Sequence, residues 1–203
     1  MKEKTKYYYN ELPLGYVKDY VIDTKEDKFT IILATVLNLL LFAGTVTIAL
    51  AFKGFQIELR ENRNIILLCT AIFLFAMIIY TILHELTHGL FYKIFTHEKL
   101  KFGMTVTVAY CGIPKIYTKK WPMVIITIAP FITFLIAFSI PLIFITNTVI
   151  YLYFSILLGF HVGGCSGDLY AVFITLFKYY KKDILINDTG PKQTFYIKNN
   201  DEE

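Results

Sequence analysis

Residues 83–90 read LHELTHGL and follow directly on a long apolar run. On an α-helix, residues four apart lie on one face, so His84 and His88 can direct two imidazole rings at one point. Glu85 lies beside that point, where it can accept a proton from a metal-activated water without being a ligand. This spacing predicts a zinc-binding helix with an acid–base group next to the metal.

The composition is typical of an integral membrane protein. Only 18 % of the residues are charged and 56 % are hydrophobic, whereas about a quarter of a soluble domain is charged. The apolar residues form four blocks, each long enough to cross a bilayer as a helix. The predicted fold is therefore an all-α polytopic membrane protein with helices at about 29–52, 65–96, 122–145 and 149–177. These helices form a membrane domain at 29–177, between an N-terminal flank at 1–28 and a C-terminal tail at 178–203.

The segment between the second and third helices has a different pattern. From Phe102 to Tyr110, larger apolar side chains alternate with small or polar ones. A period of two predicts a β-strand. Residues 111–114 then form a turn, after which residues 115–118 could pair back. We expect a short strand or hairpin here, on the cytoplasmic side of the membrane.

The positions of the basic residues predict the orientation. If both termini lie in the cytoplasm, 17 of the 20 Lys and Arg residues lie on that side. The predicted location is the cell membrane, as a multi-pass protein with both termini cytoplasmic. The net charge of +4 follows from these flanks, so the lipid bilayer is an expected partner and nucleic acid is not.

The fourth apolar block is interrupted by residues 161–168, HVGGCSGD. Ionisable residues inside a membrane segment are costly, so this interruption is a candidate functional site. The three cysteines are far apart and form no C-x-x-C pair, which argues against a thiolate zinc site.

Catalytic zinc takes three protein ligands, so a third ligand must be found. The extended motif with a third histidine is absent, and no glutamate follows Glu98 until residue 202. The remaining candidates are Asp168, Asp183, Asp188, Asp201, His97 and His161. Asp168 lies as far from the outer start of its helix as His84 does, and His161 would lie about 10 Å shallower at 1.5 Å per residue. Depth favours Asp168; His161 as the ligand, or Asp168 as a buried acid capping a broken helix, are the alternatives.

These residues resemble a known group. A membrane-embedded HELTH motif at 84–88, Pro130 early in the next crossing and a Gly-rich segment ending in Asp168 are similar to the site-2 protease class of intramembrane zinc peptidases. More closely, residues 75–196 resemble the bacterial putative zincin peptidase family. One departure is Leu169, where site-2 proteases have a glycine after the aspartate.

The resemblance implies an intramembrane zinc metallopeptidase. Zn²⁺ would be held by His84, His88 and Asp168, with Glu85 as general base. The substrate would be a membrane protein or peptide, cleaved in or near a membrane segment. His161 would stand where the class has an asparagine that contacts substrate.

The predicted strand offers an edge on which an extended substrate segment could pair. We therefore expect Val106, Val108 and Tyr110 to contact substrate, together with His161.

Two other functions are compatible with the sequence. One is a non-proteolytic zinc-binding membrane scaffold or immunity-type protein, although such a protein has no need for Glu85. The other is a small transporter with Asp168 and His161 on an ion path. Four crossings without an internal repeat disfavour a monomeric transporter. The oligomeric state is left open.

Overall fold

The computed structural model describes residues 7–54, 63–104 and 109–199. The chain divides into two compact units. The sheet unit comprises Met1–Leu33, Glu85–Ala129 and Gly167–Glu203, and the helical unit comprises Ala34–His84 and Pro130–Ser166. The long helices contribute residues to both units, and each unit has its own apolar core.

The predicted four apolar helices are confirmed within the described ranges. The helices are α1 (Lys28–Phe52), α2 (Arg63–Thr96), α3 (Lys120–Phe144) and α4 (Thr148–Gly164), and α4 is followed by α5 (Ser166–Phe173) and a π-helical segment, η1 (Ile174–Lys178). The stretches that are long and apolar enough to cross a membrane are Lys28–Phe52, Ile66–Thr96, Lys120–Phe144 and Thr148–Lys178. The last of these stretches changes helix at Cys165, inside the glycine-rich interruption.

In the helical unit, α1 and α4 approach closely because α4 carries glycines at the contact. A Cβ atom on Gly163 would lie 2.7 Å from the backbone oxygen of Asn38, and one on Gly159 would lie 2.6 Å from Val46. Small residues allow this close approach between membrane helices, where packing rather than the hydrophobic effect holds helices together. The hydroxyl of Tyr151 adds a 2.6 Å hydrogen bond to the carbonyl oxygen of Ala49.

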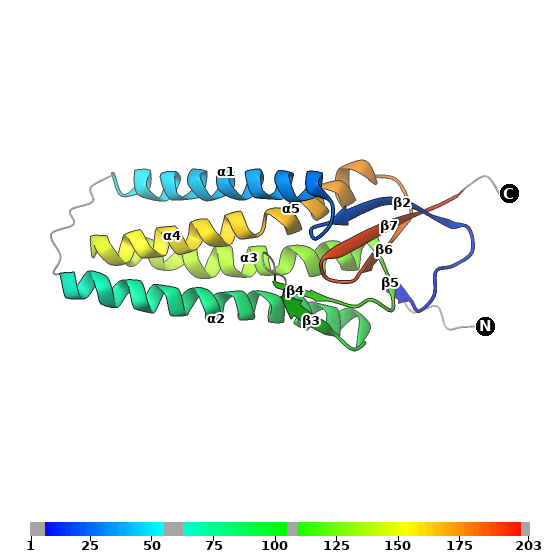
Figure 1. Cartoon of the computed structure of the whole chain (residues 1–203), viewed down its shortest axis with the longest axis horizontal. Coiled ribbons are helices and arrows are strands. Elements are labelled where there is room, and N and C mark those ends of the chain that lie inside the picture. The colour runs from blue at the N-terminus through cyan, green and yellow to red at the C-terminus, as the bar shows by residue number, and fades with distance from the viewer. Residues whose placement is uncertain (1–6, 55–62, 105–108, 200–203) are drawn as a thin grey trace. The chain divides into compact units, whose positions relative to one another are not determined.

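The sheet unit shows that the fold is not purely all-α. It contains a five-stranded antiparallel sheet in the order β1-β5-β6-β7-β2, of which β5, β6, β7 and β2 are labelled side by side in Figure 1. The strands are β1 (Tyr8–Tyr9), β2 (Tyr16–Asp23), β5 (Tyr117–Lys119), β6 (Ile184–Asp188) and β7 (Lys192–Lys198). The polar flanks at both ends of the chain thus supply β1, β2, β6 and β7. The all-α prediction was wrong because these strands lie in the flanks that were taken for solvated segments, and because β2 pairs with β7, and β1 with β5, across more than 100 residues.

The expected hairpin between the second and third helices is present, with a different pairing. Strands β3 (Lys101–Met104) and β4 (Ala109–Gly112) are antiparallel, with Lys101 opposite Gly112. The single strand predicted from Phe102 to Tyr110 is therefore wrong, because Met104 pairs with Ala109 on a separate, antiparallel strand. Residues 105–108 lie outside the described part of the chain. Strand β5 does not pair back on this hairpin but joins β1 and β6 in the large sheet.

The core of the sheet unit packs against the end of α2 that carries the HELTH motif. Ile184, Leu185 and Ile186 of β6 are fully buried. Tyr92 of α2 packs in the same apolar cluster, and its hydroxyl donates a 2.5 Å hydrogen bond to Asp188 Oδ2. Since Tyr92 lies one helical turn after His88, this bond ties the motif-bearing helix to the end of β6.

Burial raises the pKa of Asp188 from 3.8 to about 6, although the Tyr92 hydroxyl and the Gly190 amide oppose the shift. Between those two pH values the folded chain holds a proton that the unfolded chain has released. Stability contributed by this group is therefore fully present below pH 3.8 and is lost as the pH rises through 6.

We expect Asp188→Asn to remove this pH dependence. In detergent, the melting temperature of the wild type should fall relative to that of Asp188→Asn between pH 4 and pH 7. Asp183 is exposed and directly precedes β6, so the melting temperature of Asp183→Asn should depend on pH as that of the wild type does. Parallel wild-type and Asp188→Asn curves would contradict the assignment.

Candidate metal centre

The motif residues lie on a continuous helix, as predicted. Helix α2 runs from Arg63 to Thr96 without interruption, so His84 and His88 lie one turn apart on the same face. Both histidines are buried, at 9 % and 8 % exposure. Two more polar side chains, Tyr80 and Tyr92, continue the same stripe at the same spacing of four residues. The helix therefore presents four polar rings in a row.

The proton on His88 is placed by the backbone of α3. His88 Nδ1 lies 3.0 Å from the carbonyl oxygen of Ile126, and because a carbonyl oxygen only accepts, Nδ1 carries the proton. This carbonyl lacks its usual helical donor, since the residue four positions on is Pro130, which has no N–H. Pro130 thus releases the oxygen that orients His88.

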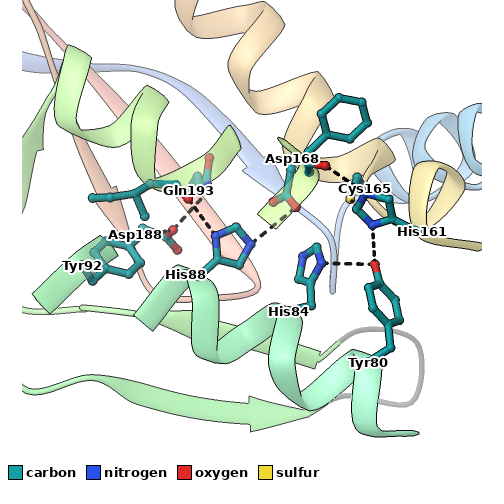
Figure 2. A network of polar contacts seen from close by, with 11 residues as sticks. Tyr80, His84, His88, Tyr92, His161, Cys165, Asp168, Asp188 and Gln193 are labelled. Atoms are coloured by element: carbon teal, nitrogen blue, oxygen red, sulfur yellow. Dashed lines mark hydrogen bonds and ion pairs between the residues drawn. The ribbon is translucent and has the colours of Figure 1, made fainter. Parts of the chain in front are cut away.

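The second nitrogen of His88 faces an acid. His88 Nε2 lies 3.4 Å from Asp168 Oδ2, as the dashed line between them shows in Figure 2. With the proton on Nδ1, neutral His88 has an acceptor lone pair at Nε2, so two acceptors face one another. Such a pair requires a cation between its atoms, either a proton or a metal ion. Tetrahedral zinc holds N and O ligands at about 2.0–2.2 Å, which puts two ligand atoms about 3.4 Å apart. The donors and their spacing therefore fit zinc.

Asp168 comes from the start of α5, just after the helix change at Cys165. It lies in the first turn of α5 and is 22 % exposed. The break that interrupts the fourth apolar block therefore places Asp168 at the N-terminus of a new helix, where the helix dipole attracts negative charge. The glycine-rich interruption thus delivers one acidic side chain to His88.

A second cluster lies in the helical unit around Tyr80. Its hydroxyl lies 3.3 Å from His84 Nδ1 and 2.8 Å from His161 Nδ1, as Figure 2 shows. Cys165 Sγ lies 3.6 Å from the same nitrogen of His161. The ligand atoms of His84, His161 and Cys165 lie within 4.8 Å of one another, so this group could also hold a metal ion.

Glu85 lies next to His84 and is half-buried, with its Oε2 atom inaccessible to solvent. Its negative charge acts on strand β4. Burial raises the pKa of the Cys111 thiol to about 12, and the carboxylates of Glu85 and Asp188 add to the shift. The acid of the motif is therefore within electrostatic range of the hairpin.

Gly89, immediately after the motif, allows the hairpin to contact the helix. A Cβ atom on Gly89 would lie 3.0 Å from the ring of Phe102 in β3 and 3.0 Å from Leu100. A larger residue at this position would push β3 away from the turn that carries His88. The hairpin therefore packs against the motif at Gly89, which has no side chain.

The residues predicted to contact substrate have different surroundings. His161 is fully buried, with Nε2 3.0 Å from the carbonyl oxygen of Phe131. The Tyr110 ring packs on Gly103 and Gly190, where a Cβ atom would collide with it. Val106 and Val108 lie outside the described residues. Contact of these four residues with substrate stays a prediction.

Sequence reasoning missed Tyr80, Tyr92 and Asp188. The two tyrosines could have been found, because they continue the four-residue spacing of the histidines on the same helix. Asp188 was considered only as a metal ligand, and its bond to Tyr92 depends on the packing of β6 against α2, which the sequence does not show.

Pro130→Ala tests how His88 is oriented. The new N–H would compete for the Ile126 carbonyl, so the Nδ1 proton of His88 should exchange faster with water in ¹⁵N-histidine NMR spectra. Pro141→Ala, in the same helix, is the matched control and should leave this proton unchanged. Equal exchange in Pro130→Ala and the wild type would show that the proline has no part in orienting the ring.

Comparison with known proteins places the chain in a family. The family model described as Putative zincin peptidase matches residues 77–184, which is more than half of the chain and includes His84, Glu85, His88 and Asp168. A search of curated proteins and a search of solved structures each found no match. With candidate membrane helices, a zincin motif on one of them and an acid against its second histidine, the chain belongs to the putative zincin peptidase family.

Proposed function

We propose that the protein is an intramembrane zinc metallopeptidase of the site-2 protease type. In this proposal His84, His88 and Asp168 hold Zn²⁺, and Glu85 is the general base. The observation that carries it is the 3.4 Å contact between His88 Nε2 and Asp168 Oδ2, a nitrogen and a carboxylate oxygen at the separation of two ligands of one zinc ion. Membership of the zincin peptidase family supports the same conclusion.

His84 completes the set by helical geometry. It precedes His88 by one turn on an unbroken helix, the spacing at which two imidazoles can bind one ion. Two nitrogen ligands and one carboxylate oxygen suit zinc, and three protein ligands leave a position for water. A purely structural zinc site would use four protein ligands and would not need Glu85.

When bound, zinc would polarise a water molecule and the substrate carbonyl. Glu85 would accept a proton from that water through a carboxylate oxygen and then give it to the amine nitrogen that leaves. Glu85 is adjacent to His84 in the helix, so its carboxylate lies beside the proposed metal position without being one of the three ligands. Asp168 stays ionised as a ligand, whereas Glu85 cycles between its two protonation states.

The hairpin is the proposed site for an extended substrate segment. On its outer side β4 lies against the β6–β7 turn, since Ile113 donates to the Asp188 carbonyl and a Cβ atom on Gly112 would lie 2.5 Å from Gly190 N. Strand β3 is thus the better edge for pairing, and it contacts the motif helix at Gly89. A membrane helix hides its carbonyls, so pairing with β3 would keep the substrate unwound for cleavage.

The proposal includes an orientation in the membrane. The distribution of Lys and Arg favours cytoplasmic termini, which puts the hairpin and the motif end of α2 near the cytoplasmic side. The substrate would be a membrane protein or peptide cut in or near its membrane segment. A zinc-binding scaffold without peptidase activity is the competing function.

Glu85→Gln should abolish cleavage and retain zinc. The measurement is release of a membrane-tethered reporter beside zinc content of the purified protein. Activity should fall by at least about 100-fold, the scale expected for a lost general base. Glu98→Gln, a glutamate just after the end of α2, should cleave like the wild type. Stoichiometric zinc with no cleavage by the wild type would favour the scaffold, and full activity in Glu85→Gln would exclude Glu85 as the base.

Asp168→Ala should lose most of its zinc. Removing one of three protein ligands lowers affinity strongly, so the zinc content after dialysis should be far below one ion per chain. Asp183→Ala removes an exposed acid and should keep the wild-type content. Equal zinc in Asp168→Ala and the wild type would show that Asp168 is not a ligand.

A further inference from the structure

A chain of hydrogen bonds in the helical unit ends on His84. It runs from the carbonyl oxygen of Phe131 to the ring of His161, then to the hydroxyl of Tyr80 and on to His84 Nδ1. The three heavy-atom distances are 3.0, 2.8 and 3.3 Å. Figure 2 shows the Tyr80 hydroxyl between the two imidazoles.

The first bond fixes the protons on His161. A carbonyl oxygen has no proton to give, so His161 Nε2 must be the donor. The ring is fully buried and is surrounded by the rings of Phe131, Phe134 and Phe138. A charged imidazolium is costly in such surroundings, so His161 is neutral and its Nδ1 is an acceptor.

The remaining protons follow in sequence. Two donors face His161 Nδ1, the Tyr80 hydroxyl at 2.8 Å and the Cys165 thiol at 3.6 Å. The hydroxyl is the nearer and the stronger donor, so the single hydroxyl proton of Tyr80 is donated to His161. The Tyr80 oxygen can then only accept from His84, so His84 Nδ1 carries a proton and His84 Nε2 carries the lone pair. The carbonyl of Phe131 thereby determines the tautomer of a histidine that it does not contact.

We propose that His161 and Tyr80 are positioning residues that hold His84 in the tautomer whose Nε2 can bind a metal ion. This inference rests on the proposed function, since it assigns the metal-binding atom of a proposed ligand. His88 reaches the same tautomer by a direct bond to the Ile126 carbonyl. Helix α3 would thus set the protonation of both histidines, once through one hydrogen bond and once through three.

The proposal gives His161 a role that excludes metal binding by this residue. Its Nε2 is bonded to Phe131 and its Nδ1 accepts from Tyr80, so a metal ion held by His84, His161 and Cys165 would have to displace the tyrosine. Two sets of residues could hold a metal ion, and both include His84: His84, His88 and Asp168, or His84, His161 and Cys165. Cys165 is a ligand only in the second set, so removal of its thiol distinguishes the two.

Two substitutions distinguish positioning from a merely structural role, because the change farther from His84 should weaken zinc binding more than the nearer one. In Tyr80→Phe, His84 loses its acceptor and samples both tautomers. In His161→Phe, Tyr80 keeps its hydroxyl but loses its acceptor, so the hydroxyl proton turns to His84 Nδ1 and moves the ring proton to Nε2. The more distant change should therefore weaken zinc binding more.

The tautomers are read in metal-free protein labelled with ¹⁵N-histidine, where the four histidines give four resolvable rings. Wild-type His84 should show the Nδ1–H tautomer, Tyr80→Phe a mixture, and His161→Phe the Nε2–H form. Chelator competition should give zinc dissociation constants weaker by several-fold for Tyr80→Phe and by about 10- to 100-fold for His161→Phe. Tyr153→Phe is the matched control, because it removes a hydroxyl bonded to Thr70 elsewhere in the helical unit.

The outcomes separate this inference from the proposed function. If zinc binding requires His84 but both variants keep the wild-type tautomer and affinity, the positioning role is wrong and the metallopeptidase proposal stands. If His84→Ala binds zinc like the wild type, the proposed ligand set is wrong. Loss of zinc in Cys165→Ser, or a thiolate charge-transfer band with Co²⁺, would make His161 a ligand and overturn the inference. Should His161→Phe fail to fold, the Tyr80→Phe spectrum decides.

Discussion

Helical periodicity places Tyr80, His84, His88 and Tyr92 on one face of α2. The proposed metal site depends on the hydrogen-bond partner that each of these four rings has. Tyr92 bonds to Asp188 at the end of β6, and His88 meets Asp168 and the Ile126 carbonyl. Tyr80 meets His84 and His161. In an apolar environment each polar atom needs a partner, so these bonds decide which nitrogen of each imidazole can bind a metal ion.

Two helix irregularities, Pro130 in α3 and the change of helix at Cys165, position residues of the proposed site. Pro130 removes a helical hydrogen bond from α3, and the released carbonyl orients His88. The change of helix at Cys165 interrupts the fourth apolar stretch and brings Asp168 into the first turn of α5. Both irregularities would be costly against lipid. The Ile126 carbonyl is bonded by His88, and the backbone N–H of Cys165 bonds to the carbonyl oxygen of His161. The helical irregularities and the candidate metal site therefore have one explanation.

Much of the helical architecture could be predicted, because a bilayer demands long apolar runs and the motif has a fixed period. The sheet could not, because β2 pairs with β7 across more than 150 residues and β5 joins β1 and β6. Pairing between strands so far apart in the sequence leaves no local pattern in either strand. Equal depth along two helices was enough to favour Asp168, and the 3.4 Å contact with His88 supports that choice. The chain of hydrogen bonds from the Phe131 carbonyl to His84 could not be predicted. It depends on which carbonyl oxygen faces which ring, and the spacing of residues in the sequence does not determine this.

The central claim is that one zinc ion is held by two imidazoles and a carboxylate. X-ray absorption at the zinc edge, on purified protein loaded with one equivalent of Zn²⁺, tests it most directly. The account predicts a shell of nitrogen and oxygen atoms at about 2.0–2.2 Å with two imidazole signatures and no sulfur. A sulfur atom at about 2.3 Å would contradict it, because that distance would place Cys165 rather than Asp168 on the metal.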